Sequence, residues 1–203
     1  MEKLDSIIYF GNSLTSWLTA LAFIVGSVIL ARIVNVIFSK VVKKYTASTE
    51  NDLDDKIADQ IEEPIAIAFV LLGFWLAYSH LVFEGSGETI AQIFQIAFVL
   101  DLTWLVSRLL DAIVEGLIIR SAARSESSMI NQIGPILRKT VRSVVWIFGV
   151  ITAMNNAGFD VAAMLAGVGI GGLAMAMAAK DFVANIFGGV TVFVDKPFKV
   201  GDR

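Results

Sequence analysis

The chain has 203 residues, a net charge of −3 and a hydrophobic content of 56%, with a mean hydropathy of +0.73. This composition is far more apolar than that of a soluble domain and predicts a membrane protein. The chain has no cysteine, which excludes disulfides and thiolate metal sites, and His80 is its single histidine. We therefore expect no metal, no cofactor, no nucleic-acid partner and no enzymatic activity.

Five hydrophobic segments predict an all-α polytopic membrane protein with five transmembrane helices. They lie at about residues 14–38, 65–83, 89–119, 136–155 and 161–179. Pro64 and Pro135 each precede an apolar segment, and we expect both at the first position of a helix, where the missing N–H is tolerated. Between the last two segments, Gly158 can end one helix and Asp160 can cap the next. This connection predicts a tight helical hairpin.

The distribution of lysine and arginine predicts the orientation in the membrane. Basic residues occur in the first and third connections and after the fifth segment, whereas the second and fourth connections contain none. Because cytoplasmic loops carry an excess of lysine and arginine, the N-terminus is predicted outside and the C-terminus in the cytoplasm, in the cell (inner) membrane.

The fifth segment carries no charge and consists mostly of small residues. Residues 167–172 match the pattern G-x-G-x-x-G, but they lie within an apolar span, so we reject a nucleotide site. Small side chains permit close packing, either within the helix bundle of one chain or between two neighbours in a symmetric ring. Leu173 and Met177, four residues apart, could project into a central opening as apolar rings that close it by dewetting. The packing residues are Ala166, Gly167, Gly169, Ile170, Gly171, Gly172, Ala174 and Ala176.

The end of the chain contains three recognisable stretches. They are residues 169–185 (GIGGLAMAMAAKDFVAN), 187–189 (FGG) and 195–202 (DKPFKVGD). Together they resemble the small-conductance mechanosensitive channel (MscS) family, and are most similar to its five-helix, YnaI-like members. The resemblance implies a homo-oligomeric ion channel, a heptamer, that membrane tension opens and that protects the cell from osmotic stress.

The resemblance also implies roles for individual residues. Leu173 and Met177 correspond to the pore constriction, and the helix is expected to break near Asp181 or at Gly188 and Gly189. Ala166, Ile170 and Ala174 would pack against Gly169, Gly172 and Ala176 of the adjacent subunit.

The implied organisation has three parts. Residues 1–158 form lipid-facing helices, residues 159–190 form the pore helix and an interfacial segment, and residues 191–203 begin a cytoplasmic β domain. The β-branched run from Thr191 to Val194, followed by a turn at Asp195–Pro197, is the predicted first strand, and we expect the chain to stop at the start of that domain.

Charged residues near the pore and within the third segment have two interpretations each. Lys180 and Asp181 would form charged rings at the pore mouth, acting either in ion selection or as an intersubunit salt bridge. Arg108 and Asp111 are three apart and can pair on one helix face. Asp101 lies in mid-span without an evident partner; it is either structural or the coupling carboxylate of a secondary transporter, which is the alternative function.

A basic group, Arg138, Lys139 and Arg142, begins the fourth segment. Its default interpretation is a solvated helix end, and its functional interpretation is contact with anionic lipid headgroups.

Overall fold

A computed structural model describes residues 7–38, 40, 52–83, 87–124 and 128–195. The chain divides into two compact units, Met1–Phe159 and Asp160–Arg203. Each unit is described separately below.

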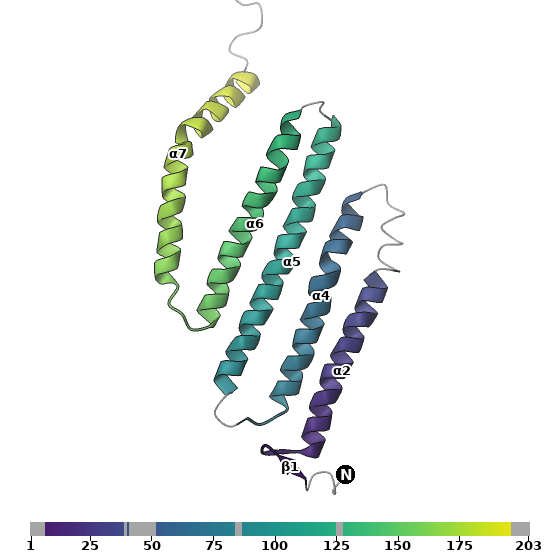
Figure 1. Cartoon of the computed structure of the whole chain (residues 1–203). Helices are drawn as coiled ribbons and strands as arrows, with labels where there is room; N and C mark the ends of the chain where they lie inside the picture. Colours follow the sequence, from purple (N-terminus) through teal and green to yellow (C-terminus); the bar gives the residue numbers. More distant parts are fainter. Residues whose placement is uncertain (1–6, 39, 41–51, 84–86, 125–127, 196–203) are drawn as a thin grey trace, which may run out of the picture. The chain divides into compact units, whose positions relative to one another are not determined.

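The first unit is a row of four helices preceded by a small β-hairpin. The hairpin pairs β1 (Ile8–Tyr9) with β2 (Asn12–Ser13), and the helices are α2 (Leu14–Ile37), α4 (Asp52–Ser79), α5 (Gly87–Arg124) and α6 (Ser128–Asn156). Each helix packs against the next one in the chain, so the four lie side by side (Figure 1). Within the row, α4 therefore lies between α2 and α5.

The helices of the row approach closely because small residues line their contacts. A Cβ atom added at Gly73 of α4 would overlap Ser27 of α2, and one added at Gly149 of α6 would overlap Thr103 of α5. The two hydroxyl groups donate to carbonyls of their own helices, Ser27 to Ile24 at 2.8 Å and Thr103 to Val99 at 2.7 Å. Such contacts bring backbones together without leaving a polar group unpaired, as helices in lipid require. Other buried members of these contacts are Ala20, Ala31, Ala58, Ala77, Ser107, Ala112 and Ala153.

Four helices of the described chain are long and apolar enough to cross a membrane: α2, α4 from Lys56, α5 as far as Ile118, and α7 of the second unit. The helical membrane architecture predicted from the sequence is confirmed at this level. Although α6 is a helix of 29 residues, it is not among these four, because Arg138, Lys139 and Arg142 interrupt its first half and two asparagines end it. A count of five spans therefore stays a prediction.

The two prolines do not begin their helices, as the sequence had led us to expect. Helix α4 begins at Asp52 and contains Pro64, and α6 begins at Ser128 and contains Pro135. Both helices therefore extend beyond their apolar segments, and in α4 the added part contains Lys56, which pairs with Glu115 of α5. With 28 residues, α4 is about 42 Å long and exceeds a hydrocarbon core of about 30 Å.

The β-hairpin is fastened to the connection between α4 and α5 by the buried side chain of Asn12. Its Nδ2 donates to the carbonyl of Val82 at 2.8 Å, and its Oδ1 accepts from the N–H of Val82 at 2.7 Å. At the turn, Phe10 has φ 51° and Gly11 has φ 77°. Both lie in the left-handed region that a two-residue hairpin turn requires, and this conformation is unusual for phenylalanine.

At the end of α6 the predicted caps are confirmed. Gly158 has φ 83°; its N–H donates to the carbonyl of Asn155 at 2.9 Å, and the N–H of Phe159 donates to that of Met154 at 3.1 Å. This pair of bonds is the Schellman motif, which needs a left-handed residue. In the second unit, Asp160 Oδ1 accepts from the first helical N–H, that of Ala162, at 2.9 Å.

The second unit consists of α7 (Ala162–Asp195). The helix continues through residues 191–195, where the sequence had predicted a strand, and residues 196–203 lie outside the described residues. A helix satisfies its backbone groups internally, whereas β-branched residues favour a strand only where a neighbouring strand can pair with them. The ribbon of α7 bends part-way along its length (Figure 1). No residue is assigned to the bend, so Asp181, Gly188 and Gly189 stay hinge predictions.

Candidate pore helix and charge network

The predicted pore helix exposes its whole length. In α7, all of which the structure describes, no residue is buried; Leu173 is 63% exposed and Met177 is 70% exposed. A Cβ atom added at any of its glycines would meet nothing within 4 Å. These open glycines are Gly167, Gly169, Gly171, Gly172, Gly188 and Gly189.

The helical register sorts the first half of α7 into two ridges and two thin flanks. Successive residues are about 100° apart around the helix, so residues spaced three, four and seven apart share a face. One ridge carries Ile170, Leu173 and Met177. The opposite ridge carries Met164, Val168 and Met175. One thin flank is made by Gly167, Gly171, Ala174 and Ala178. The other is made by Gly169, Gly172 and Ala176, and Leu165 lies in line with it one turn earlier.

This register bears on the packing residues predicted from the sequence, which stay predictions. The small residues of α7 fall into two flanks, because bulky ridges separate them. Ile170, predicted to pack against the adjacent subunit with Ala166 and Ala174, also shares a face with Leu173 and Met177. Ala166 also falls on this ridge, whereas Ala174 falls on a thin flank.

Lys180 and Asp181 lie on the exposed surface of α7. Consecutive residues of a helix point about 100° apart, so the two side chains do not face each other within one chain. A salt bridge between them would need two subunits.

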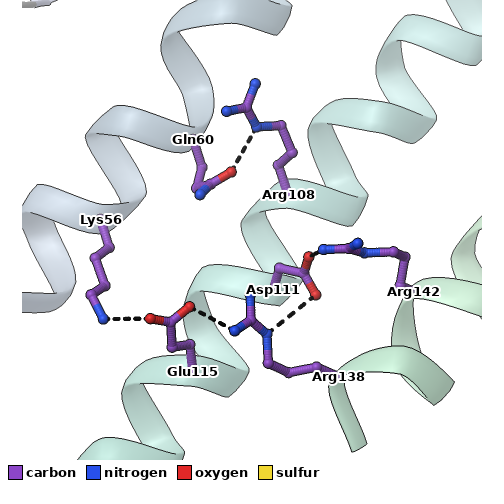
Figure 2. A network of polar contacts seen from close by, with 7 residues as sticks. All are labelled: Lys56, Gln60, Arg108, Asp111, Glu115, Arg138 and Arg142. Carbon is purple, nitrogen blue, oxygen red and sulfur yellow. Dashed lines mark hydrogen bonds and ion pairs between the residues drawn. The ribbon is translucent and has the colours of Figure 1, made fainter. Parts of the chain in front are cut away.

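The polar side chains of the row gather into a network that joins α4, α5 and α6 (Figure 2). At its centre is Asp111 of α5, whose side chain is only 6% exposed. It forms an ion pair with Arg142 of α6, and its Oδ1 lies 3.9 Å from Nε of Arg138. Two guanidinium groups of α6 thus compensate one buried carboxylate of α5.

Glu115 extends the network one turn further along α5. Its Oε2 accepts from Nη1 of Arg138 at 2.9 Å, and its Oε1 accepts from Nζ of Lys56 of α4 at 2.6 Å. An uninterrupted path of ion pairs therefore runs from α4 through α5 to α6 (Figure 2). Because this path is partly buried, salt and water weaken it less than they weaken surface pairs.

Arg108 and Asp111 do not pair with each other, contrary to the expectation from their spacing. Nε of Arg108 donates to Oε1 of Gln60 at 2.6 Å, and its Nη1 pairs with Glu63. Its guanidinium carbon also lies 5.1 Å from the centre of the Trp104 ring. Arg108 thus faces α4, whereas Asp111 continues the stripe of Thr103 and Ser107 that faces α6. The buried Asp111 carboxylate is stabilised by the arginines of α6 that are packed against it, whereas Arg108 faces another helix and cannot reach it.

Two of the three predicted lipid-contact residues take part in this network. Arg138 and Arg142 are ion-paired, whereas the described residues offer Lys139 no ion-pair partner. All three line a cavity of about 720 Å³ between α5 and α6, together with Glu115. Lipid contact stays a prediction, and the structure adds an internal role for the two arginines.

Asp101 of α5 remains the least satisfied charged residue of the row. Its Oδ1 is buried, and no hydrogen-bond partner exists for it in the described part of the chain. This agrees with the absence of an evident partner in the sequence.

The sequence interpretation missed Lys56, Gln60 and Glu115. A signal was nevertheless present: Asp111 and Glu115 are four apart on one helix, and Arg138 and Arg142 are four apart on the next. Two antiparallel helices with opposite charges at the same spacing bring both pairs into register.

The sequence of the whole chain was compared with known proteins. No family model matches, and no solved structure matches. The chain is 30% identical over 204 residues to the large-conductance mechanosensitive channel MscMJLR of Methanocaldococcus jannaschii, covering 100% of this chain and 56% of that protein. It is 30% identical over 193 residues to the small-conductance mechanosensitive channel MscMJ of the same organism, covering 95% of this chain and 55% of that one. The chain belongs to the MscS family.

A third relative is YnaI itself, after which the predicted YnaI-like subgroup is named. The low conductance mechanosensitive channel YnaI of Escherichia coli is 33% identical over 67 residues, which are 33% of this chain and 20% of that protein. The chain spans about half the length of the first two relatives.

Proposed function

We propose that this member of the MscS family is a mechanosensitive ion channel: a homo-oligomer in which α7 lines the pore and membrane tension opens it. The names of the relatives that match nearly the whole chain support this activity. We further propose a heptamer in the cell (inner) membrane, with the N-terminus outside and a role in osmotic protection. These details follow the family resemblance and the distribution of basic residues.

The observation that carries the proposal is the pattern of two ridges and two thin flanks on α7. A helix in a ring must touch one neighbour on each side, and glycine and alanine on both flanks allow these two close approaches. The ridges then point in the two remaining directions, one toward the axis and one away from it. A helix that packs on a single partner needs only one small-residue face.

The ridge toward the axis would form the gate. Leu173 and Met177 would project apolar side chains into the pore, and Ile170 would add a third ring one turn away. A narrow apolar constriction excludes water and therefore ions. Tension acting on the helix row would separate the α7 helices, widen the neck and let it become wet.

A patch-clamp recording with two matched substitutions tests the gate. Membranes containing the full chain would be stretched by a suction ramp at fixed voltage, and discrete current steps above a pressure threshold are expected. Met177→Ser should lower the threshold and raise the resting leak, because a hydroxyl makes the neck easier to wet. Met175→Ser, two residues away on the opposite ridge, should leave both unchanged.

Two results would contradict the proposal. Equal thresholds for Met177→Ser and the parent would remove Met177 from the gate, and Leu173→Ser would then show whether the ridge as a whole is misplaced. Silence up to the pressure of patch rupture, for a correctly inserted oligomer, would argue against tension gating by this chain.

The buried Oδ1 of Asp101, which has no hydrogen-bond partner in the described part of the chain, favours one second candidate, a secondary transporter that uses this residue for ion coupling. Vesicles with an imposed proton gradient distinguish the two functions. A transporter shows solute uptake that depends on the gradient and disappears in Asp101→Asn, whereas a channel shows pressure-dependent currents that persist in this variant.

A further inference from the structure

One face of the helix row contains an apolar groove that none of the proposed functions uses. It has a volume of about 410 Å³ and is lined by α2, α4 and α5 together with the loop after α4. Because α4 lies between the other two helices, the groove runs over α4 with α2 and α5 as its sides. Ala20 and Ala77, each 3% exposed, leave the space that larger residues would fill.

The lining is apolar along the groove, and its polar atoms lie at one end. Leu21, Ile24, Phe74 and Phe94 line its length. At the end nearest the β-hairpin, the indole N–H of Trp17 donates to the carbonyl of Tyr9 at 3.2 Å. The groove thus has an apolar body and an aromatic, polar mouth, as a membrane interface requires.

The mouth is held in a fixed shape by aromatic contacts. Phe83 stacks on Tyr78 with ring centres 5.6 Å apart and planes 4° apart, and meets the edge of Trp17 at 6.3 Å. The Tyr78 hydroxyl donates to the carbonyl of Gly87 at 3.4 Å, and Asn12 fastens the hairpin to Val82, next to Phe83. The mouth is therefore a built feature of the folded row.

We propose that this groove binds one acyl chain of a phospholipid from the membrane leaflet on the side of the β-hairpin. The chain would lie along α4 between α2 and α5, with the lipid headgroup beside Trp17 and Tyr78. Three observations favour this occupant: the side helices are long and apolar enough to span a membrane, the described residues along the body are apolar, and Trp17 and Tyr78 bring polar atoms to the end where the headgroup would be. The inference requires the helices to lie in a membrane and does not depend on channel activity.

Photolabelling of the full chain tests the groove directly. The protein is reconstituted into phosphatidylglycerol and phosphatidylcholine vesicles that contain a phosphatidylcholine with a diazirine near the end of one acyl chain. After irradiation, labelled residues are located by mass spectrometry. We expect labels to concentrate on Leu21, Ile24, Phe74 and Phe94 rather than on lipid-facing residues elsewhere on α2.

A matched pair of tryptophan substitutions supplies the control. Leu21→Trp, which places a larger ring in the groove, should reduce labelling of Phe74 and Phe94 several-fold. Leu18→Trp, one turn away on the exposed surface of α2 and outside the groove, should not change it. Both positions are exposed, so neither substitution opposes the packing of α2 on α4.

A third variant tests the mouth without filling the groove. Asn12→Ala should reduce labelling in the groove while the helix content and the melting temperature of the remaining row stay close to those of the parent. Uniform labelling of all lipid-facing residues would overturn the proposal, because the groove would then hold no particular chain. Labelling that spares the groove alone would also overturn it, showing that protein covers this face.

Discussion

Three glycines of the helix row differ from those of α7 in what surrounds them, although Gly26 of α2 is as open as the glycines of α7. Gly73, Gly134 and Gly149 meet neighbouring helices so closely that an added Cβ would overlap them; at Gly134 the nearest atom, Cδ1 of Ile118, would be 2.9 Å away. Gly167, Gly171 and all other glycines of α7 meet nothing within 4 Å. Glycine therefore permits close contacts between helices within the row, whereas in α7 it leaves open space in which another helix could pack.

Charged residues repeat this contrast. The row pairs its acids and bases within one chain, and Asp111 alone engages two arginines of α6. In α7, Lys180 and Asp181 have no ion-pair partner in the described part of the chain. The described contacts of the row are thus made within its own unit, whereas we expect the contacts of α7 to come from outside its own unit.

Removal of Arg142 tests how far the row depends on its own network, and we expect the largest effect here. Arg142→Ala would leave the Asp111 carboxylate buried with only the more distant Arg138, and should lower the free energy of unfolding by about 3 kcal/mol. Denaturant unfolding of the purified protein in detergent measures this loss. Lys139→Ala is the control, because this lysine lacks an ion-pair partner among the described residues, and its stability should remain that of the parent.

The contrast between glycines can be tested directly with two equal substitutions. Gly149→Val should destabilise the row by about 1–3 kcal/mol, because its side chain would overlap Thr103. Gly171→Val has open space in the subunit, so it should leave subunit unfolding unchanged but reduce the fraction of oligomer seen by native mass spectrometry. If Gly171→Val instead destabilises the subunit as much as Gly149→Val does, the comparison between row and pore helix fails.

The smallest effect is expected at the charged end of the pore helix. If Lys180 contributes a ring of charge to the pore, Lys180→Gln should make the pore more permeable to cations. The reversal potential in a salt gradient should then shift by a few millivolts toward the equilibrium potential of the cation, while the pressure threshold stays unchanged. If the lysine forms a salt bridge with Asp181 of a neighbour, the threshold should change and Asp181→Asn should mimic it. The two measurements therefore decide between the two interpretations of this pair.

Much of the row was predictable because its signals are local. Apolar segments predicted the helices, and Gly158 and Asp160 predicted the helix end and the following cap, since both features depend on residues a few positions apart. The helix starts were misplaced because Pro64 and Pro135 suggested first positions. The observed starts, Asp52 and Ser128, lie in more polar sequence, which a search for hydrophobic segments does not detect.

The candidate site was predictable to a smaller extent. The small residues of α7 indicated close packing, but their division into two flanks required the helical register, which also places Ile170 on the face of Leu173. Arg108 and Asp111 were assigned to each other because spacing shows which residues share a helix, not which way each side chain turns. The hairpin and its Asn12 contact depend on residues 70 positions apart in sequence, and no local pattern indicates such a contact.

The helix row is joined at both of its ends. At one end, Asn12 fastens the hairpin to the loop between α4 and α5; toward the other, Asp111 and Glu115 connect α5 to its two neighbours. Helices that are joined at only one end can spread apart at the other end, but helices joined at both ends tilt together. Only α4 and α5 take part in both sets of contacts, so we expect a force that lipids apply at one end of this pair to tilt the two helices together rather than to spread them.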